Sequence, residues 1–187
     1  DVSYSMMALL GSNRMVEAEW IVKFWQRILP VLRQRAKDAG LPGIACPAPM
    51  SPWGESVAKS REQLLEERHF ITANIALHVW QLYQYSGRMN VLKDYWDCLA
   101  EPVAFLLGAC VEEFPDHAEI IRSSGPNGKE RVDGKVVYHP NPIRTLLATI
   151  EAVRAIHEAA RLLGKTPDPR WKRLLPKLER GINANRF

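Results

Sequence analysis

Residues 141–164 have the sequence NPIRTLLATIEAVRAIHEAARLLG, which carries the clearest structural signal in the 187-residue chain. Apolar side chains recur in it at intervals of three and four, which places them on one face of an α-helix. Asn141 can cap this helix with Pro142 in the first helical position, and Gly164 can end it. The segment therefore predicts an amphipathic helix whose apolar face is formed by Ile143, Leu146, Leu147, Ile150 and Val153.

Two earlier helices are predicted on the same grounds. Ser3–Leu10 is mainly apolar and stops at Gly11, so it predicts a short helix. Across Arg14–Ala39, apolar residues again recur at intervals of three and four, and Gly40 follows them as a helix-ending residue. Pro30 lies inside this second helix and is expected to kink it, because proline lacks a backbone N–H and clashes with the preceding turn.

The middle of the chain predicts two more helices. Residues 60–63 (Ser-Arg-Glu-Gln) match a capping box, the pattern in which a serine and a glutamine satisfy free N–H groups at a helix start. Apolar residues then follow a helical period until Gly87, which is expected to end the helix. A further helix is predicted from about Val91 to Val111, interrupted or kinked at Pro102.

Two long segments lack the helical pattern and are predicted to be loops. Residues 41–59 hold four prolines and two glycines, and residues 112–139 lose the period of three and four. In the second loop, residues 125–128 (Gly-Pro-Asn-Gly) are a strong turn signal, and alternating valines after them suggest a short hairpin. Long loops in compact domains usually carry binding or catalysis, so both are expected to be functional.

The predicted fold class is all-α, built from antiparallel helical hairpins, with residues 1–187 forming a single helical domain. Asp168 and Pro169 repeat the cap-and-proline start ahead of a last helix over residues 171–182, which brings the prediction to about six helices. The first residues already have the pattern of a folded helix and the chain starts at Asp1, so it is expected to be a piece of a longer polypeptide.

The composition excludes several classes of protein. The net charge is +4, from 25 basic and 21 acidic residues, and the basic residues are scattered, which argues against a nucleic-acid partner. No run approaches the ~18 apolar residues of a membrane span, so no membrane partner is expected. The three cysteines have no metal-ligand spacing, no cluster implies a metal or an organic cofactor, and a cytoplasmic location is favoured.

Several stretches, in order along nearly the whole chain, match the motifs of one known family. The matching stretches are Leu29-Pro30, residues 33–40, Pro42-Gly43, Pro52-Trp53-Gly54-Glu55, residues 69–76 with Val79-Trp80-Gln81, Gly125-Pro126-Asn127 with residues 130–133, and residues 159–164. Together they resemble a segment of glycoside hydrolase family 65 and its relatives. The resemblance implies a carbohydrate substrate and a toroid of six helical hairpins, (α/α)₆, around a sugar-binding cleft. This chain would supply about half of that ring, with the rest from the same polypeptide or from a homo-oligomer.

The resemblance also implies a glycosidase in which a glutamate of the loop motif G-P-D-E is the general acid. In this sequence Asn127 takes the place of the Asp, residues 128–129 are inserted, and Glu130 is the nearest carboxylate that can be the acid. An inverting glycosidase pairs such an acid with a carboxylate base roughly 6.5–9.5 Å away. No residue of the chain is distinguished as that base, and the alternative for Glu130 is a solvated loop glutamate.

Four further residues are candidates for holding the sugar. Trp53 lies in a proline-rich loop, where its indole can stack on a pyranose or else anchor the loop. Glu55 can accept hydrogen bonds from sugar hydroxyls or remain a surface charge. His69 and Asn74 can bind hydroxyls as donor and acceptor, or form a satisfied interior pair. His78 shares the apolar stripe of its helix and is predicted to be a core histidine, and Trp80 is also predicted to lie in the core.

Two alternative functions remain open at this stage. The first is a disaccharide phosphorylase of the same fold, in which inorganic phosphate replaces the attacking water. The phosphate-binding segment of that family would lie beyond residue 187. The second is a non-catalytic helical-repeat module that binds a protein partner, because stacked helical hairpins also form solenoids.

Overall fold

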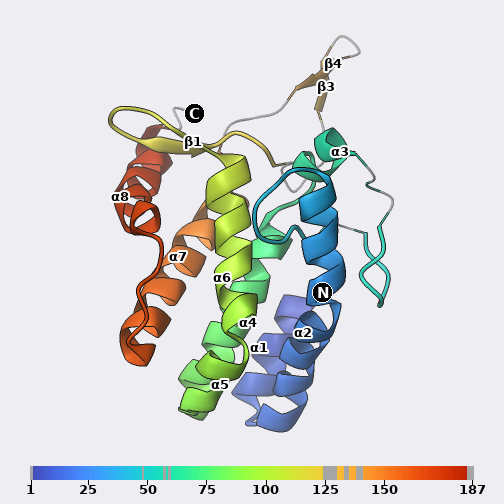
Figure 1. Cartoon of the computed structure of the whole chain (residues 1–187), viewed down its shortest axis with the longest axis vertical. Helices are drawn as coiled ribbons and strands as arrows, with labels where there is room; N and C mark the ends of the chain where they lie inside the picture. The colour runs from blue at the N-terminus through green and yellow to red at the C-terminus, as the bar shows by residue number, and fades with distance from the viewer. Residues whose placement is uncertain are drawn as a thin grey trace.

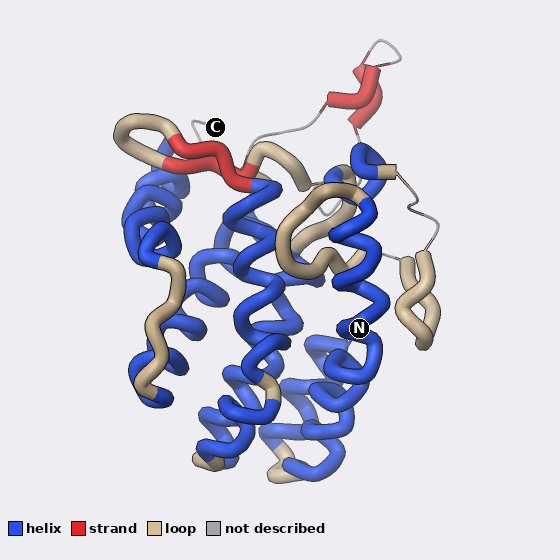
Figure 2. The backbone as a smooth tube through the Cα atoms, viewed as in Figure 1, coloured by secondary structure: helices blue, strands red, loops and turns tan. Residues whose placement is uncertain are grey.

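The computed structural model describes residues 2–47, 49–56, 58, 60–123, 130–132, 135–137 and 141–184, and it is mostly helical (Figures 1 and 2). The helices are α1 (Val2–Gly11), α2 (Met15–Asp38), α3 (Arg61–Leu65), α4 (Phe70–Ser86), α5 (Met89–Asp94), α6 (Trp96–Phe105), α7 (Ile143–Leu163) and α8 (Pro169–Ala184), and a π-helical turn, η1 (Leu106–Cys110), extends α6. The strands are β1 (Val111–Glu113) with β2 (Ala118–Ile120), and β3 (Glu130–Val132) with β4 (Lys135–Val137), each pair antiparallel.

The helices form two layers of successive helical pairs. Helices α1, α4 and α7 lie in one layer, and α2, α6 and α8 lie in the other (Figure 1). Residues 12–14, 87–88 and 164–168 make short turns at one end of the layers. The described parts of the long segments 39–60 and 111–142 lie toward the opposite end, shown at the top of Figure 2, except that residues 49–56 run down beside α2. We call this opposite end the loop end, because it carries α3 and all four strands.

Helix α4 is the centre of the core. It contacts α1, α2, α5, α6 and α7, and its apolar side chains are buried around most of its circumference. Its closest neighbour, α7, turns a face of small side chains toward the core, which allows two helices to approach closely. The fully buried apolar residues of α4 are Ala73, Ile75, Ala76, Val79 and Leu82, and the buried alanines of α7 are Ala152, Ala155, Ala159 and Ala160.

The outer helices are amphipathic. Helix α2 buries Val22, Ile28 and Leu32 along one side and exposes charged residues along the other, and Pro30 is accommodated within it. Trp80 packs against the core from α4, as predicted. Among the described residues, no helix combines the length and the apolar character needed to cross a membrane.

The predicted helix after residue 141 is confirmed, but its start is not the one expected. Pro142 is the residue before the first helical turn, and Asn141 makes no cap. Instead, Asn141 Oδ1 accepts a hydrogen bond from the Ile120 backbone N–H at 2.6 Å, and its amide nitrogen donates to the Gly181 carbonyl at 3.3 Å. Asn141 therefore ties β2 to α8. The predicted cap at Asp168 is confirmed, since its Oδ1 accepts from the Arg170 N–H at 2.8 Å.

The predicted helix from Ser60 to Gly87 is interrupted. The capping box is present, with Gln63 N–H donating to Ser60 Oγ at 3.1 Å, but α3 ends at Leu65 and α4 starts only at Phe70. The gap is held by Ser123, whose Oγ accepts from the His69 N–H at 3.1 Å and donates to the Glu67 carbonyl at 3.3 Å. A residue 54 positions away in sequence therefore sets this break.

The predicted helix from Val91 to Val111 breaks at Tyr95 and not at Pro102, which lies inside α6. The Tyr95 hydroxyl donates to Glu19 at 3.1 Å, and Arg88 pairs with the same carboxylate at 2.6 Å. The β1–β2 hairpin was not predicted, whereas paired strands at Val132 and Val136 agree with the hairpin expected there.

Gly43 lets the first long loop pass directly against α6. Its φ is +64°, and a Cβ placed on it would lie 2.1 Å from the Glu101 carbonyl oxygen. The next residue, Ile44, donates its backbone N–H to that same oxygen at 3.3 Å and is fully buried. The loop is thus docked by backbone contact, which leaves no space for a side chain at residue 43.

We expect Gly43→Ala to destabilise the protein far more than Gly87→Ala. Both glycines have φ of +64°, but no atom lies within 4 Å of a Cβ at Gly87. The conformational cost of about 1 kcal/mol is common to both variants, and the clash adds about 1–3 kcal/mol at residue 43 alone. Urea unfolding of both variants measures the difference, and equal losses would show that the loop is not held against α6.

Candidate functional site

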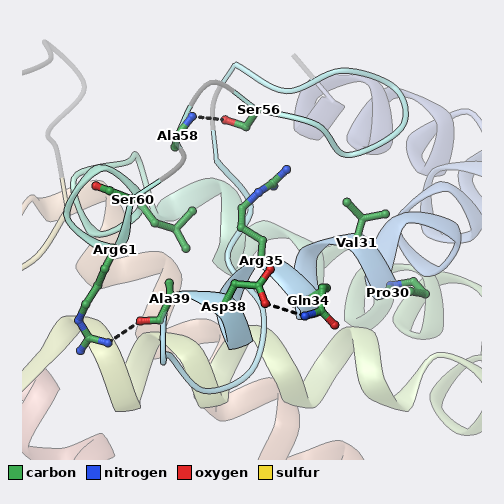
Figure 3. Close-up of a pocket in the computed structure, with 11 residues that line it drawn as sticks. Pro30, Val31, Gln34, Arg35, Asp38, Ala39, Ser56, Ala58, Ser60 and Arg61 are labelled. Atoms are coloured by element: carbon green, nitrogen blue, oxygen red, sulfur yellow. Dashed lines mark hydrogen bonds between the residues drawn. The ribbon is translucent and has the colours of Figure 1, made fainter.

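A pocket opens at the loop end (Figure 3). It lies between the last turns of α2, the part of the first long loop that holds Ser56, Ala58 and Ser60, and α3. Its volume is about 850 Å³, within the range of small-molecule sites. The lining mixes apolar surface with planar polar groups and hydroxyls. The lining residues are Pro30, Val31, Gln34, Arg35, Asp38, Ala39, Ser56, Ala58, Ser60, Arg61 and Leu64.

Arg35 is the central charged group of this pocket. Its side chain points from α2 toward the loop that carries Ser56 (Figure 3), and Nη2 donates to the Gly54 carbonyl at 2.5 Å. Its Nη1 is buried and has no hydrogen-bond partner among the described residues. Burial is the main cause that lowers the pKa of Arg35, while the nearby Cys46 and Glu55 favour its charged form. The guanidinium is therefore a partly desolvated cation with a vacant donor.

The remaining polar groups of the pocket are fixed by hydrogen bonds. Gln34 Nε2 donates to Asp38 Oδ1 at 2.7 Å, which holds both side chains on the exposed face of α2. Arg61 Nη1 donates to the Ala39 and Gly40 carbonyls at 2.7 and 2.9 Å, so it closes the carboxyl end of α2. Because these groups are already ordered, a ligand would meet them without further loss of side-chain entropy.

Trp53 and Glu55 lie in the loop that supplies Ser56 to the pocket. Ser51 Oγ accepts the backbone N–H groups of Trp53 at 3.3 Å and Glu55 at 3.1 Å, so the turn between them is ordered. Gly54 has φ of +85° and packs on α2. The Trp53 indole is 71% exposed, and Glu55 is also exposed. Both candidates therefore lie on the loop that also supplies Ser56 to the pocket, but neither is among the described lining residues.

His69 lies elsewhere, in the core. Its side chain is fully buried and packs on Phe105 with ring centroids 4.9 Å apart. Burial lowers the pKa of His69 to about 4, and interaction with the backbone of Leu65 and Leu64 opposes this shift only in part. Neither ring nitrogen has a well-formed hydrogen bond among the described residues. His69 therefore has no surface with which to touch a sugar in this structure.

Asn74 belongs to a hydrogen-bonded chain between α1, α2 and α4. Its Nδ2 donates to Ser3 Oγ at 2.8 Å, Ser3 Oγ lies 3.2 Å from His78 Nε2, and Trp25 Nε1 donates to His78 Nδ1 at 3.0 Å. The indole N–H can only donate, so Nδ1 is the acceptor and the proton of the neutral ring is on Nε2. His78 therefore donates to Ser3 and cannot act as its base. The prediction of a satisfied core histidine is confirmed.

The structure gives only the backbone of Glu130, the candidate general acid. It lies in β3 opposite Val137 on β4, and its side chain is outside the described residues, as are residues 124–129 and Asp133. The β3–β4 hairpin projects beyond the helices at the loop end (Figure 1). No group of three or more His, Cys, Asp or Glu side chains in the described part of the chain is arranged to bind a metal ion.

No protein-family model matches this sequence, and no curated protein matches it significantly. The site is therefore defined by its geometry. Sequence reasoning had singled out Trp53 and Glu55, but it missed Arg35, Gln34 and Asp38. The signal for these three was their position, because they lie on the exposed face of a predicted helix in the last two turns before a long loop.

We expect stability to fall between pH 7.5 and pH 5.0 because two histidines are buried in the neutral form. Burial lowers the pKa of His69 and of His78 to about 4 each, below the 6.5 of the unfolded chain. Between these values the unfolded state binds more protons, so stability is complete above pH 6.5 and is lost on acidification, by about 2 kcal/mol per histidine at pH 5.0.

Urea unfolding at the two pH values measures this loss, and His78→Gln should remove about half of it. His157, whose pKa is also lowered by burial, adds to the loss. His117, whose pKa is raised by hydrogen bonding to Asp116, opposes it. An undiminished loss in the His78→Gln variant would mean that His78 is not held neutral in the folded protein.

Proposed function

We propose that this chain is part of a carbohydrate-active helical enzyme that hydrolyses a glycosidic bond with inversion, with Glu130 as the general acid. In this proposal the pocket at the loop end holds a sugar unit, Trp53 stacks on the sugar, and Glu55 accepts hydrogen bonds from its hydroxyls. The observation that carries the proposal is the exposed indole of Trp53 on a loop whose later residues, Ser56 and Ala58, line a polar pocket.

The position of Trp53 supports stacking more than anchoring. An anchoring indole would be buried against the domain, but this one is 71% exposed while its own backbone is held by Ser51. A rigid, exposed aromatic ring offers a large apolar face with little entropy to lose on binding. This is the property that a pyranose face requires.

The chemistry of the pocket also suits a sugar. Sugar hydroxyls both donate and accept, so they are bound best by fixed groups of both kinds. The Asp38 carboxylate can accept, the Arg35 guanidinium can donate, and the Gln34 amide can do both. These three side chains lie on consecutive turns of one face of α2, and all three line the pocket.

The arrangement of the helices is consistent with a segment of a ring. Successive helical pairs in two layers, with every long connection at one end, are what half of a six-hairpin toroid would supply. The proposal also accounts for exposed apolar side chains on the free side of the first helical pair, because a neighbouring pair in the ring would cover them. These side chains are Tyr4, Met7, Val16 and Trp20.

The proposed reaction needs two carboxyl groups on opposite sides of the glycosidic bond. Glu130 would protonate the leaving oxygen, and a base not yet identified would remove a proton from the attacking water. His69 is fully buried and Asn74 is partly buried and bonded to Ser3, so in this proposal they support the helices and do not contact the sugar. The same acid would serve a phosphorylase, in which inorganic phosphate is the nucleophile.

Trp53→Ala should reduce the stabilisation of the protein by its sugar. Screening mono- and disaccharides by thermal shift identifies a ligand, and loss of the stacking ring should weaken binding by about 1–2 kcal/mol, or roughly 5-fold to 30-fold. Trp20→Ala is the control, because Trp20 is 61% exposed on α2 but lies outside the pocket. Equal losses in both variants, or no response to any sugar, would refute the proposed sugar site.

Glu130→Gln should lower the rate of glycoside cleavage by about 10²-fold to 10⁴-fold, the usual effect of losing a general acid. Glu112→Gln is the matched control, because Glu112 is an exposed glutamate on β1 at the same end of the molecule. Steady-state kinetics on an aryl glycoside and on a natural disaccharide should show the loss mainly for the poorer leaving group. Turnover near that of the unmodified protein would place the acid at another residue.

A further inference from the structure

The pocket contains a positively charged group, the Arg35 guanidinium, with which a neutral sugar would form no ion pair. The Arg35 side chain is only partly exposed, and among the described residues its one hydrogen bond runs from Nη2 to the Gly54 carbonyl. Nη1 is buried without an acceptor among the described residues. A buried donor without a partner is costly, so an oxygen that reaches Nη1 adds a hydrogen bond without displacing one.

The charges around Arg35 leave this cation available to a ligand. Asp38 is the one carboxylate among the described lining residues, and it already accepts from Gln34. Glu55 lies close enough to favour the charged form of Arg35, but the structure shows no hydrogen bond or ion pair between these two described side chains. Arg35 is thus bound to a neutral carbonyl and to no carboxylate in the described part of the chain.

The end of α2 would normally repel an anion, because the carboxyl end of a helix carries partial negative charge. Here Arg61 reaches back from α3 and donates to the Ala39 and Gly40 carbonyls, which offsets that charge. The hydroxyls of Ser56 and Ser60 line the same space. The pocket therefore combines a vacant guanidinium donor with a shielded helix end, and such a combination suits an oxyanion.

We propose that the pocket selects a sugar that carries an anionic group, a carboxylate or a phosphate, which pairs with the Arg35 guanidinium. This inference rests on the proposed function, since it names the class of sugar that the site would accept. The anionic group would sit over Arg35, and the sugar ring would extend toward the loop of Trp53. Gln34 and Asp38 would meet the ring hydroxyls.

Isothermal titration with glucose, glucuronate, glucose 6-phosphate and inorganic phosphate tests the inference. We expect an anionic sugar to bind about tenfold to hundredfold more tightly than glucose, the range for one charge-assisted hydrogen bond. Glucuronate and glucose 6-phosphate separate the two sources of the negative charge. Inorganic phosphate alone should bind more weakly than either anionic sugar.

Three variants assign the selectivity to the pocket. Arg35→Gln should remove the preference for the anionic sugar, so that glucose and the anionic sugars bind with similar affinity. Asp38→Asn removes the competing carboxylate from an exposed position, so it should strengthen binding of the anionic sugar by about 2-fold to 5-fold. Arg27→Gln is the control, because it changes the net charge equally on the exposed side of α2 but lies outside the lining.

The outcomes separate this inference from the proposed function. If glucose binds as tightly as both anionic sugars, and Asp38→Asn changes neither, the site holds a sugar but the inference is wrong. If inorganic phosphate binds as tightly as the anionic sugars, the pocket is only an anion site and the inference is also wrong. If no sugar binds, both the inference and the proposed function fail. The Asp38→Asn variant is expected to bind the anionic sugar more tightly. The inference can therefore still be tested if the Arg35→Gln variant does not fold.

Discussion

The structure depends on the close packing of α4 between its neighbours. A helix that is apolar on nearly all sides is stable only when other helices surround it, and α4 contacts helices of both layers. The alanine face of α7 brings the two axes together, and the neutral His78 satisfies the indole of Trp25 at the boundary with α2.

The helices were predictable because their signals are local. Apolar spacing, the capping box at Ser60 and the left-handed glycines at Gly87 and Gly164 act within a few residues, and the structure has each of them. The errors occurred where a distant group takes a backbone or side-chain bond. Ser123 divides α3 from α4, and the bonds of Asn141 to Ile120 and Gly181 replace the expected cap. No local pattern reveals such a partner.

The same distinction explains what could be foreseen of the site. An aromatic residue in a proline-rich loop is a local signal, and it drew attention to Trp53, whose indole is exposed in the structure. The importance of Arg35 depends on where the loop returns, because its donor meets the Gly54 carbonyl only after the chain has turned back over α2. His69 was misplaced for the converse reason, since a histidine at a helix start gives no sign that Phe105 will cover it.

The first long loop also shows why the pocket can be both ordered and open. Its first part is core, with Ile44 and Ala45 fully buried and the Cys46 N–H donating to Thr72 Oγ1 at 3.0 Å. Its second part turns outward, and the Arg35 bond to the Gly54 carbonyl ties it to α2. A ligand that draws Arg35 toward itself would therefore act on the bond that also holds the Trp53 turn. Recognition of a charged group and placement of the indole would then be coupled through the Arg35 guanidinium. Its Nη1 would meet the ligand, while its Nη2 holds the Gly54 carbonyl next to Trp53.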